Sequence, residues 1–303
     1  MFGKTLLKMK ETLGAMFRNR NSRTGTANTA QEPGTETGKC AVSGAVASDV
    51  GCVRSNNEDN YILGKNMNQD SSDCIRAVEG FAGDSDVWKF AGVFDGMGGG
   101  EAGELASRDS AVIFLAEIER LPENPVKSDV DTCMRGAFLQ ANNRIIDLQA
   151  QYEIFGTTGT VVVSDGSEFK LYHLGDSRAY LFRGGALSQL TRDQTLAQMK
   201  LEMGMYREND PAEAADRHKL TEYIGRDWTK ENLKPVESLW VTAGQGDLLL
   251  LCSDGLYDMC SDAEIAEILG GSESLEEKVT AMVRRAREAG GEDNITCMLV
   301  AFD

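Results

Sequence analysis

Five acidic positions share one local pattern, in which a strand-like run lies beside a carboxylate and a small or turn-forming residue. They are Glu58-Asp59 before NYIL, Asp95 after GVF, Asp176 after YHLG, Asp254 after LLLLCS and Asp293 before NITCMLV. A single aspartate at a strand end is weak evidence, because it is common in ordinary turns. Several carboxylates gathered at one end of a sheet repel one another and are costly to desolvate unless a cation neutralises them. The pattern therefore predicts a cation site.

The donor atoms indicate which cation. Oxygen ligands suit hard ions such as Mg²⁺ or Mn²⁺. The chain has only two histidines, His173 and His218, and no CxxC pair among its seven cysteines, so zinc is not expected. In FDGMGGG, the missing side chain of Gly96 would let a metal reach the Gly96 carbonyl as well as the Asp95 carboxylate. A tight strand-to-helix turn without an ion also explains the glycines, but not the other carboxylates.

A metal centre with several carboxylates suits phosphoryl chemistry, in which paired ions clamp a phosphate and supply a hydroxide nucleophile. Such a site also needs a fixed positive group for the remaining phosphate oxygens. Arg54, four residues before Glu58, is the candidate, because its planar guanidinium can bind two oxygens at once. The alternative is an ordinary surface arginine. Cys252 and His173 lie in strand-like runs and are expected to be core residues rather than catalysts.

The elements that must position these residues can be predicted from composition and periodicity. Strand-type segments are AVSGAVAS, VWKFAGVF, GTVVVSD, FKLYHLGD, RAYLFR, ALSQL, SLWVTA, DLLLLC and ITCMLVAF. The Gly184-Gly185 pair between two of them predicts an antiparallel hairpin. Helical segments come in pairs, 101–120 with 128–151 and 262–269 with 274–288. Consecutive strands and paired helices favour a layered α+β sandwich over a doubly wound parallel sheet.

Two further segments differ from this pattern. Residues 192–220 are polar and Met-rich, and we expect an excursion from the sandwich with its own short helices. Residues 1–23 carry six basic residues against one acidic residue, with apolar residues at three- and four-residue steps. They could form a helix on an anionic membrane or a solvated tail, and neither is favoured. Residues 24–39 read as a flexible linker.

The composition limits the partners and the compartment. A formal net charge of −17 argues against nucleic acid as the main partner, because phosphate backbones need clustered Lys and Arg. The scattered cysteines favour free thiols in a reducing cytoplasm. No apolar run is long enough for a membrane-spanning helix, and no secretory signal is expected.

Taken in order, six motifs resemble the metal-dependent protein phosphatases, the type 2C serine/threonine class, in its compact bacterial form. They are SDVGCVRSNNEDNYIL, GVFDGMGGGEAGELAS, TTGTVVV, LYHLGDSRAYLFRGGALSQLTRDQT, LLLLCSDGLYD and GEDNITCMLV, and the resemblance covers about residues 41–302. It implies a phosphatase domain over 40–303 built as a four-layer α-β-β-α sandwich of two antiparallel sheets flanked by helix pairs. It also implies that 192–220 forms a small flap beside the site.

The resemblance implies a binuclear Mn²⁺/Mg²⁺ site and assigns roles by position. Asp95 would bridge both ions, the Gly96 carbonyl would bind one, and Asp254 and Asp293 would hold one ion. Glu58 and Asp59 would act on the second ion, directly or through its waters. Asp176 would help to bind a third, weaker ion. Arg54 would hold the substrate phosphate, which places Arg54, Asp95 and Asp254 at the centre of catalysis.

The implied reaction is hydrolysis of phosphoserine or phosphothreonine by a metal-bridging hydroxide, without a covalent intermediate. Two positions depart from many relatives. Met97 stands where animal members often carry a possible general acid, His, and Gln194 stands where many relatives have His. The departures leave the source of the leaving-group proton and the flap contacts open.

The resemblance also implies phosphorylated proteins as partners, with a serine/threonine kinase that makes them. We expect a cytoplasmic monomer, with peripheral membrane contact through residues 1–23 as one option. Two other functions stay open. One is a catalytically silent binding or scaffold module, which the complete ligand set disfavours. The other is a phosphatase for small metabolites or for one dedicated regulator.

Overall fold

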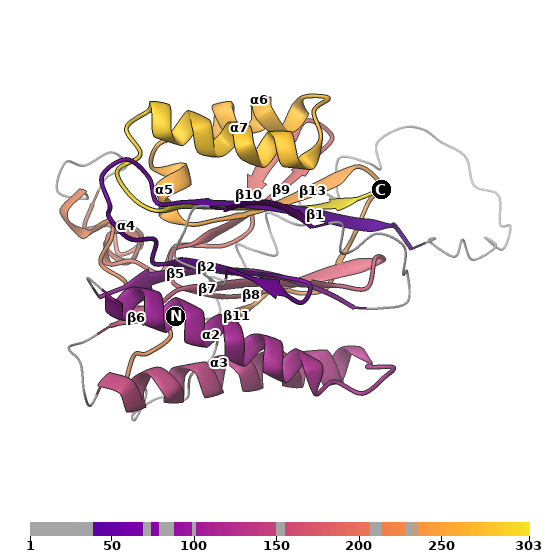
Figure 1. The fold of residues 1–303 in the computed structure, drawn as a ribbon, viewed down its shortest axis with the longest axis horizontal. Helices are drawn as coiled ribbons and strands as arrows, with labels where there is room; N and C mark the ends of the chain where they lie inside the picture. The colour runs from indigo at the N-terminus through magenta and orange to yellow at the C-terminus, as the bar shows by residue number, and fades with distance from the viewer. Residues whose placement is uncertain are drawn as a thin grey trace, which may run out of the picture. The chain divides into compact units, whose positions relative to one another are not determined.

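Two β-sheets face each other in the computed structural model, which describes residues 39–68, 74–78, 88–98, 101–149, 155–206, 214–227, 233 and 235–303 (Figure 1). The helix or tail expected over 1–23 and the linker up to residue 38 lie outside the described residues. Residues 39–303 belong to a single compact unit.

The first sheet is formed by six strands, all antiparallel to their neighbours. Their spatial order is β10 (Ala186–Gln189), β9 (Arg178–Arg183), β13 (Asp247–Cys252), β14 (Ile295–Phe302), β1 (Val42–Asp49) and β4 (Cys74–Val78). Strands β9 and β10 form the predicted hairpin, with Arg183 opposite Ala186. Gly184 and Gly185 both have positive φ, 60° and 80°, as a two-residue turn of this kind requires.

The second sheet is also antiparallel throughout. Its main order is β11 (Val236–Glu237), β8 (Glu168–Leu174), β7 (Gly159–Ser164), β5 (Lys89–Met97), β2 (Asp59–Leu63) and β3 (Asn66–Met67). In addition, β12 (Val241–Thr242) pairs with β8, and β6 (Gly156–Thr157) pairs with β5. The predicted strand SLWVTA is therefore reduced to the two residues of β12.

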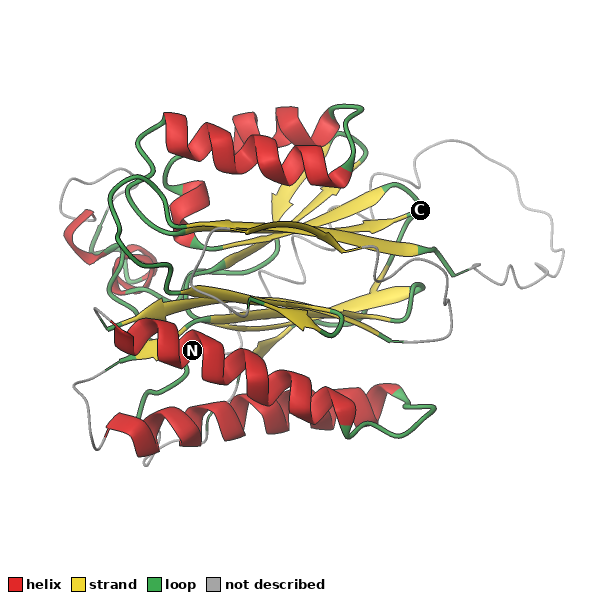
Figure 2. Ribbon diagram, in the orientation of Figure 1, coloured by secondary structure: helices red, strands yellow, loops and turns green. Residues whose placement is uncertain are grey.

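Helix pairs cover the outer face of each sheet (Figures 1 and 2). Helices α2 (Glu101–Glu119) and α3 (Lys127–Gln149) pack on the second sheet, and α6 (Asp262–Gly270) and α7 (Leu275–Glu288) pack on the first. Helix α7 begins with a capping box between Ser274 and Glu277, and it buries Val279 and Met282 against the first sheet. The predicted four-layer α+β sandwich is confirmed.

Shorter helices lie near one end of the sandwich. Helix α5 (Asp254–Tyr257) directly follows β13, and the expected short helices of 192–220 are α4 (Leu196–Glu202) and the 3₁₀ turn η1 (Ala214–Asp216). That this segment acts as a flap stays a prediction. No helix among the described residues has the length and apolar character that a membrane span requires.

Two short connections cross between the sheets at the end where these short helices lie. Residues 50–58 lead from β1 to β2, and residues 175–177 lead from β8 to β9. The register places the end of β13 and the beginning of β14 at the same end, because Cys252 lies opposite Cys297 and Asp49 opposite Ile295. Every acidic motif of the sequence is therefore brought to this end.

Candidate metal centre

A cavity of about 480 Å³ opens at this end, between the two sheets. Seven of the predicted site residues line it: Arg54, Glu58, Asp95, Gly96, Asp176, Asp254 and Asp293. The lining also includes residues that sequence reasoning did not place in the site, among them Thr158, His218, Asp258 and Asn294. The eighth predicted residue, Asp59, is not part of the lining.

The backbone of Asp95 is fixed on both sides by the TTG motif. Its N–H donates to Thr158 Oγ1 at 2.9 Å, and its carbonyl accepts from Thr158 N and from Thr157 Oγ1, both at 2.8 Å. Its carboxylate receives no hydrogen bond from the residues that the structure describes. Burial and the nearby charge of Asp254 raise the pKa of Asp95 well above its ordinary value. The backbone at Asp95 is thus fixed, and the carboxylate has no hydrogen-bond partner among the described residues.

Asp59 lies between the sheets beside the cavity. It is opposite Asp95 across the β2–β5 pair, where two like charges destabilise the pairing. Ser253, which precedes Asp254, donates its hydroxyl to Asp59 Oδ2 at 2.7 Å. Burial raises the pKa of Asp59 to about 7, and this hydrogen bond offsets part of the effect. Asp59 therefore connects the two sheets under the cavity, and its predicted action on an ion stays a prediction.

Asn294 joins the turn of Asp293 to the loop of Arg54 and Glu58. Its amide nitrogen donates to the carbonyls of Val50 at 3.0 Å and Asn56 at 2.9 Å, and its oxygen accepts from Glu58 N at 2.8 Å. At the rim of the cavity, the Arg54 guanidinium lies 2.6 Å from Asp293 Oδ2. A buried amide therefore fixes the distance between the phosphate-binding candidate and two ligand candidates.

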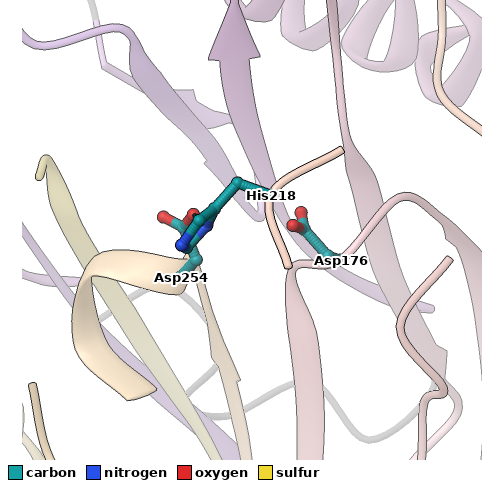
Figure 3. Close-up of side chains that lie close together, drawn as sticks. All are labelled: Asp176, His218 and Asp254. Carbon is teal, nitrogen blue, oxygen red and sulfur yellow. Dashed lines mark hydrogen bonds and ion pairs between the residues drawn. The ribbon is translucent and has the colours of Figure 1, made fainter. Parts of the chain in front are cut away.

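The turn between β8 and β9 brings Asp176 toward Asp254, and His218 lies against the same carboxylate (Figure 3). His218 Nδ1 is 3.2 Å from Asp254 Oδ2, and its Nε2 is 3.5 Å from Asp258 Oδ2. The hydrogen bond to Asp254 raises the pKa of His218 to about 9. The sequence carried no spacing signal for His218, because its place depends on how residues 192–220 fold back onto the site.

The structure gives a reason for glycine at position 96 that the sequence did not reveal. A Cβ on Gly96 would overlap the carbonyl oxygen of Gly103 in helix α2 and lie 2.6 Å from the carbonyl oxygen of Glu58. A Cβ on Gly103 would in turn overlap the carboxylate of Glu58. The glycines therefore let α2 approach β5 and leave space for Glu58 at the cavity.

The residues present fit divalent cations. Asp95 and Asp176 line one cavity, and no other residue in the described part of the chain donates a hydrogen bond to either carboxylate. Burial raises the pKa of each, with the charge of Asp254 adding to the effect. Burial and Asp254 also raise the pKa of Asp293. Mutual repulsion of this kind is relieved by cations, and the set of oxygen donors suits hard ions. No cation is needed to explain the fold, but one is needed to balance these charges.

Comparison with known proteins agrees with this site. A model of the protein phosphatase 2C family matches residues 43–200. The serine/threonine phosphatase Stp of Listeria monocytogenes is 32% identical over 215 residues, which are 70% of this chain and 83% of that protein. The chain belongs to the protein phosphatase 2C family, as the motifs predicted.

Two further relatives extend the comparison. The serine/threonine protein phosphatase PstP of Mycobacterium tuberculosis is 31% identical over 84% of this chain, which spans only 44% of PstP's length. The PstP catalytic domain, solved with two manganese ions, has a TM-score of 0.65 at 29% identity and covers 86% of this chain and 97% of its own. The Streptococcus agalactiae serine/threonine phosphatase has a TM-score of 0.75 at 26% identity, over 86% of this chain and 100% of its own. These names agree with the predicted class of enzyme.

Proposed function

We propose that this protein is a metal-dependent serine/threonine protein phosphatase that hydrolyses phosphoserine and phosphothreonine in other proteins. The observation that carries the proposal is the convergence of Glu58, Asp95, Asp176, Asp254 and Asp293 on one cavity. The names of its relatives and the two manganese ions of the PstP structure support the same conclusion. Phosphoproteins are the substrate class that follows.

Two Mn²⁺ or Mg²⁺ ions would be held by the carboxylates of Asp95, Asp254 and Asp293 and by the carbonyl of Gly96. Glu58 and Asp59 would act on one of these two ions. Asp176 would act on a third ion. When bound, such ions neutralise phosphate charge and lower the pKa of water, which provides a nucleophile near neutral pH. The TTG motif holds Asp95 by its backbone alone, so that both carboxylate oxygens stay available to cations.

Arg54 binds the phosphate oxygens that the ions leave free. Its side chain is 51% exposed and lies at the rim, and its guanidinium already pairs with an acidic oxygen of Asp293. A planar guanidinium suits two phosphate oxygens at once. Asn294 keeps this arginine at a constant distance from the carboxylates, so a bound phosphate is oriented against them. Met97 lines the cavity and has no proton to donate to the leaving group.

The test is hydrolysis of a phosphothreonine peptide by the purified chain with Mn²⁺ and, separately, with EDTA. We expect turnover with Mn²⁺ and none with EDTA. A chain that binds Mn²⁺ but hydrolyses no phosphopeptide would instead be a silent binding module or a narrowly specific phosphatase. Turnover of small phosphorylated metabolites without turnover of phosphopeptides would identify the substrate class as metabolites.

The proposal includes a cytoplasmic monomer that reverses the action of a serine/threonine kinase. Six cysteines among the described residues are free thiols, which supports a reducing compartment. The basic residues of 1–23 support contact with anionic membranes. Sedimentation of the chain with vesicles of anionic lipid, with and without residues 1–39, tests that contact, and equal sedimentation of the two forms would exclude it.

A further inference from the structure

Three side chains from separate segments meet at one edge of the cavity: Asp176, His218 and Asp254 (Figure 3). One potential ligand atom from each lies within 4.8 Å of the other two. Asp176 comes from the β8–β9 turn, Asp254 begins α5, and His218 belongs to the segment that follows η1. This group is called the Asp176–His218–Asp254 cluster below.

The carboxylate of Asp176 is the strongest sign of a ligand at this cluster. The residue is only 5% exposed and lines the cavity. Among the described residues, no other residue donates a hydrogen bond to this carboxylate or forms an ion pair with it. Its close electrostatic neighbours include Asp254 and Asp193, which have the same charge. A buried carboxylate that accepts only its own backbone N–H and faces a second carboxylate is an arrangement that a cation completes.

The surroundings of His218 orient its ring for coordination. Nε2 faces Asp258 Oδ2 at 3.5 Å, while Nδ1 faces Asp254. A carboxylate beside a ring nitrogen favours a proton on that nitrogen, and here both nitrogens face carboxylates. A cation at the cluster would replace the proton on Nδ1, while Asp258 would hold the proton on Nε2 and so orient the ring, as carboxylates beside metal-bound histidines do.

We propose that His218 supplies a nitrogen ligand to a divalent cation held by Asp176 and Asp254, with Asp258 orienting the imidazole. The inference rests on the proposed function, since it concerns a cation of the same centre, and it adds a ligand that none of the sequence motifs contains. The ligand comes from the 192–220 segment. Cation binding therefore ties that segment to α5 and to the β8–β9 turn.

A mixed donor set has a consequence for the choice of ion. Imidazole favours transition metals, whereas carboxylate and carbonyl oxygens serve Mg²⁺ and Mn²⁺ alike. The cluster is therefore expected to prefer Mn²⁺ over Mg²⁺. The remaining candidate ligands of the centre offer only oxygen, so nitrogen coordination is a specific signature of His218.

Pulsed EPR of the tag-free full chain with Mn²⁺ tests the assignment, because electron-spin-echo modulation detects an imidazole ¹⁴N bound to the ion. The chain contains only two histidines, so the variants His218→Gln and His173→Gln form a matched pair. We expect ¹⁴N modulation in the wild type and in His173→Gln as the weakest site fills, and its loss in His218→Gln. No modulation at saturating Mn²⁺, or unchanged modulation in His218→Gln, would overturn the proposal.

Calorimetric titration with Mn²⁺ tests the role of Asp258. Removal of a carboxylate that orients a metal-bound histidine weakens binding by about tenfold or more. We expect that loss at the weakest site in Asp258→Asn, and unchanged affinity there would refute the orienting role.

The two proposals fail in different ways. Nitrogen coordination without phosphopeptide turnover would refute the proposed function alone, and turnover without nitrogen coordination would refute the ligand alone.

Discussion

The side-chain oxygen of Asn294 accepts a 2.8 Å hydrogen bond from the backbone N–H of Glu58, 236 residues earlier in the chain. Together with its bonds to Val50 and Asn56, this amide holds the loop of Arg54 against the turn of Asp293. Asn294 is therefore a positioning residue.

Asn294→Ala is expected to raise the KM for a phosphopeptide and to lower kcat, because Arg54 and Glu58 lose their fixed position. The loss of three hydrogen bonds should also reduce the free energy of unfolding by about 2–3 kcal/mol. Asn294→Asp retains the acceptor for Glu58 but not the two donors, so it should recover only part of the loss. Wild-type kinetics in Asn294→Ala would show that the loop is held by other contacts.

Asp254→Asn is expected to reduce Mn²⁺-dependent turnover by about 100-fold or more, equivalent to about 2.7 kcal/mol of the activation barrier. The reason is the loss of a charged ligand, and the fold should survive. Asp147→Asn, on an exposed turn of α3, is the matched control and should be neutral. Initial rates and circular dichroism measure both effects. Full turnover in Asp254→Asn would refute its assignment as a ligand.

Gly103→Ala and Gly136→Ala compare two helical glycines that have different surroundings. A Cβ at Gly103 would overlap the Glu58 carboxylate and lie 3.0 Å from the Gly96 carbonyl carbon, whereas one at Gly136 would meet nothing nearer than 3.7 Å. Both changes should gain about 1 kcal/mol of helix propensity. We expect weaker Mn²⁺ binding and slower turnover in Gly103→Ala only. Equal turnover in the two variants would indicate that Glu58 adjusts without consequence.

His173 gives a pH dependence of stability that is separate from the metal centre. Burial lowers its pKa from 6.5 to about 4, so the folded state holds the neutral ring while the unfolded state takes up a proton below pH 6.5. The stability that results is complete above pH 6.5 and is lost as the pH falls toward 4. It amounts to about 3 kcal/mol, because each unit of pKa shift corresponds to about 1.36 kcal/mol.

Urea unfolding of wild type and His173→Gln in EDTA, measured between pH 4 and 7, checks this effect. The wild-type free energy of unfolding should rise with pH more steeply than that of the variant, by up to about 1.4 kcal/mol per pH unit. Parallel curves would show that His173 binds the same number of protons in both states.

Much of the fold could be predicted because its signals are local. The runs DLLLLC and ITCMLVAF coincide with β13 and β14, and α6 and α7 lie within one residue of the predicted bounds. The two-residue strands β3, β6 and β11 could not be predicted, since so short a pairing leaves no periodic pattern. Five of the cavity-lining carboxylates were found because each lies at one end of a strand-like run.

The site also contains features that only the folded chain reveals. Glu58 and Asp59 are adjacent, and successive residues entering a strand point to opposite sides. The sequence could not tell which of them lines the cavity, and the structure places Glu58 there and Asp59 beside Ser253. His218 and Asn294 act through contacts with residues distant in sequence, for which no spacing rule exists.

The ligand candidates are divided between the two sheets. Asp95 and Gly96 belong to β5 of the second sheet, whereas Asp254 and Asp293 adjoin β13 and β14 of the first. A cation held by both sets is a removable cross-link between the halves of the sandwich. Separation of the sheets would break its bonds to one of the two sets, so the free energy of unfolding would increase with the logarithm of free cation concentration. The supply of metal ions in the cell would accordingly determine how long each copy of the protein survives unfolding and proteolysis, in addition to how fast it works.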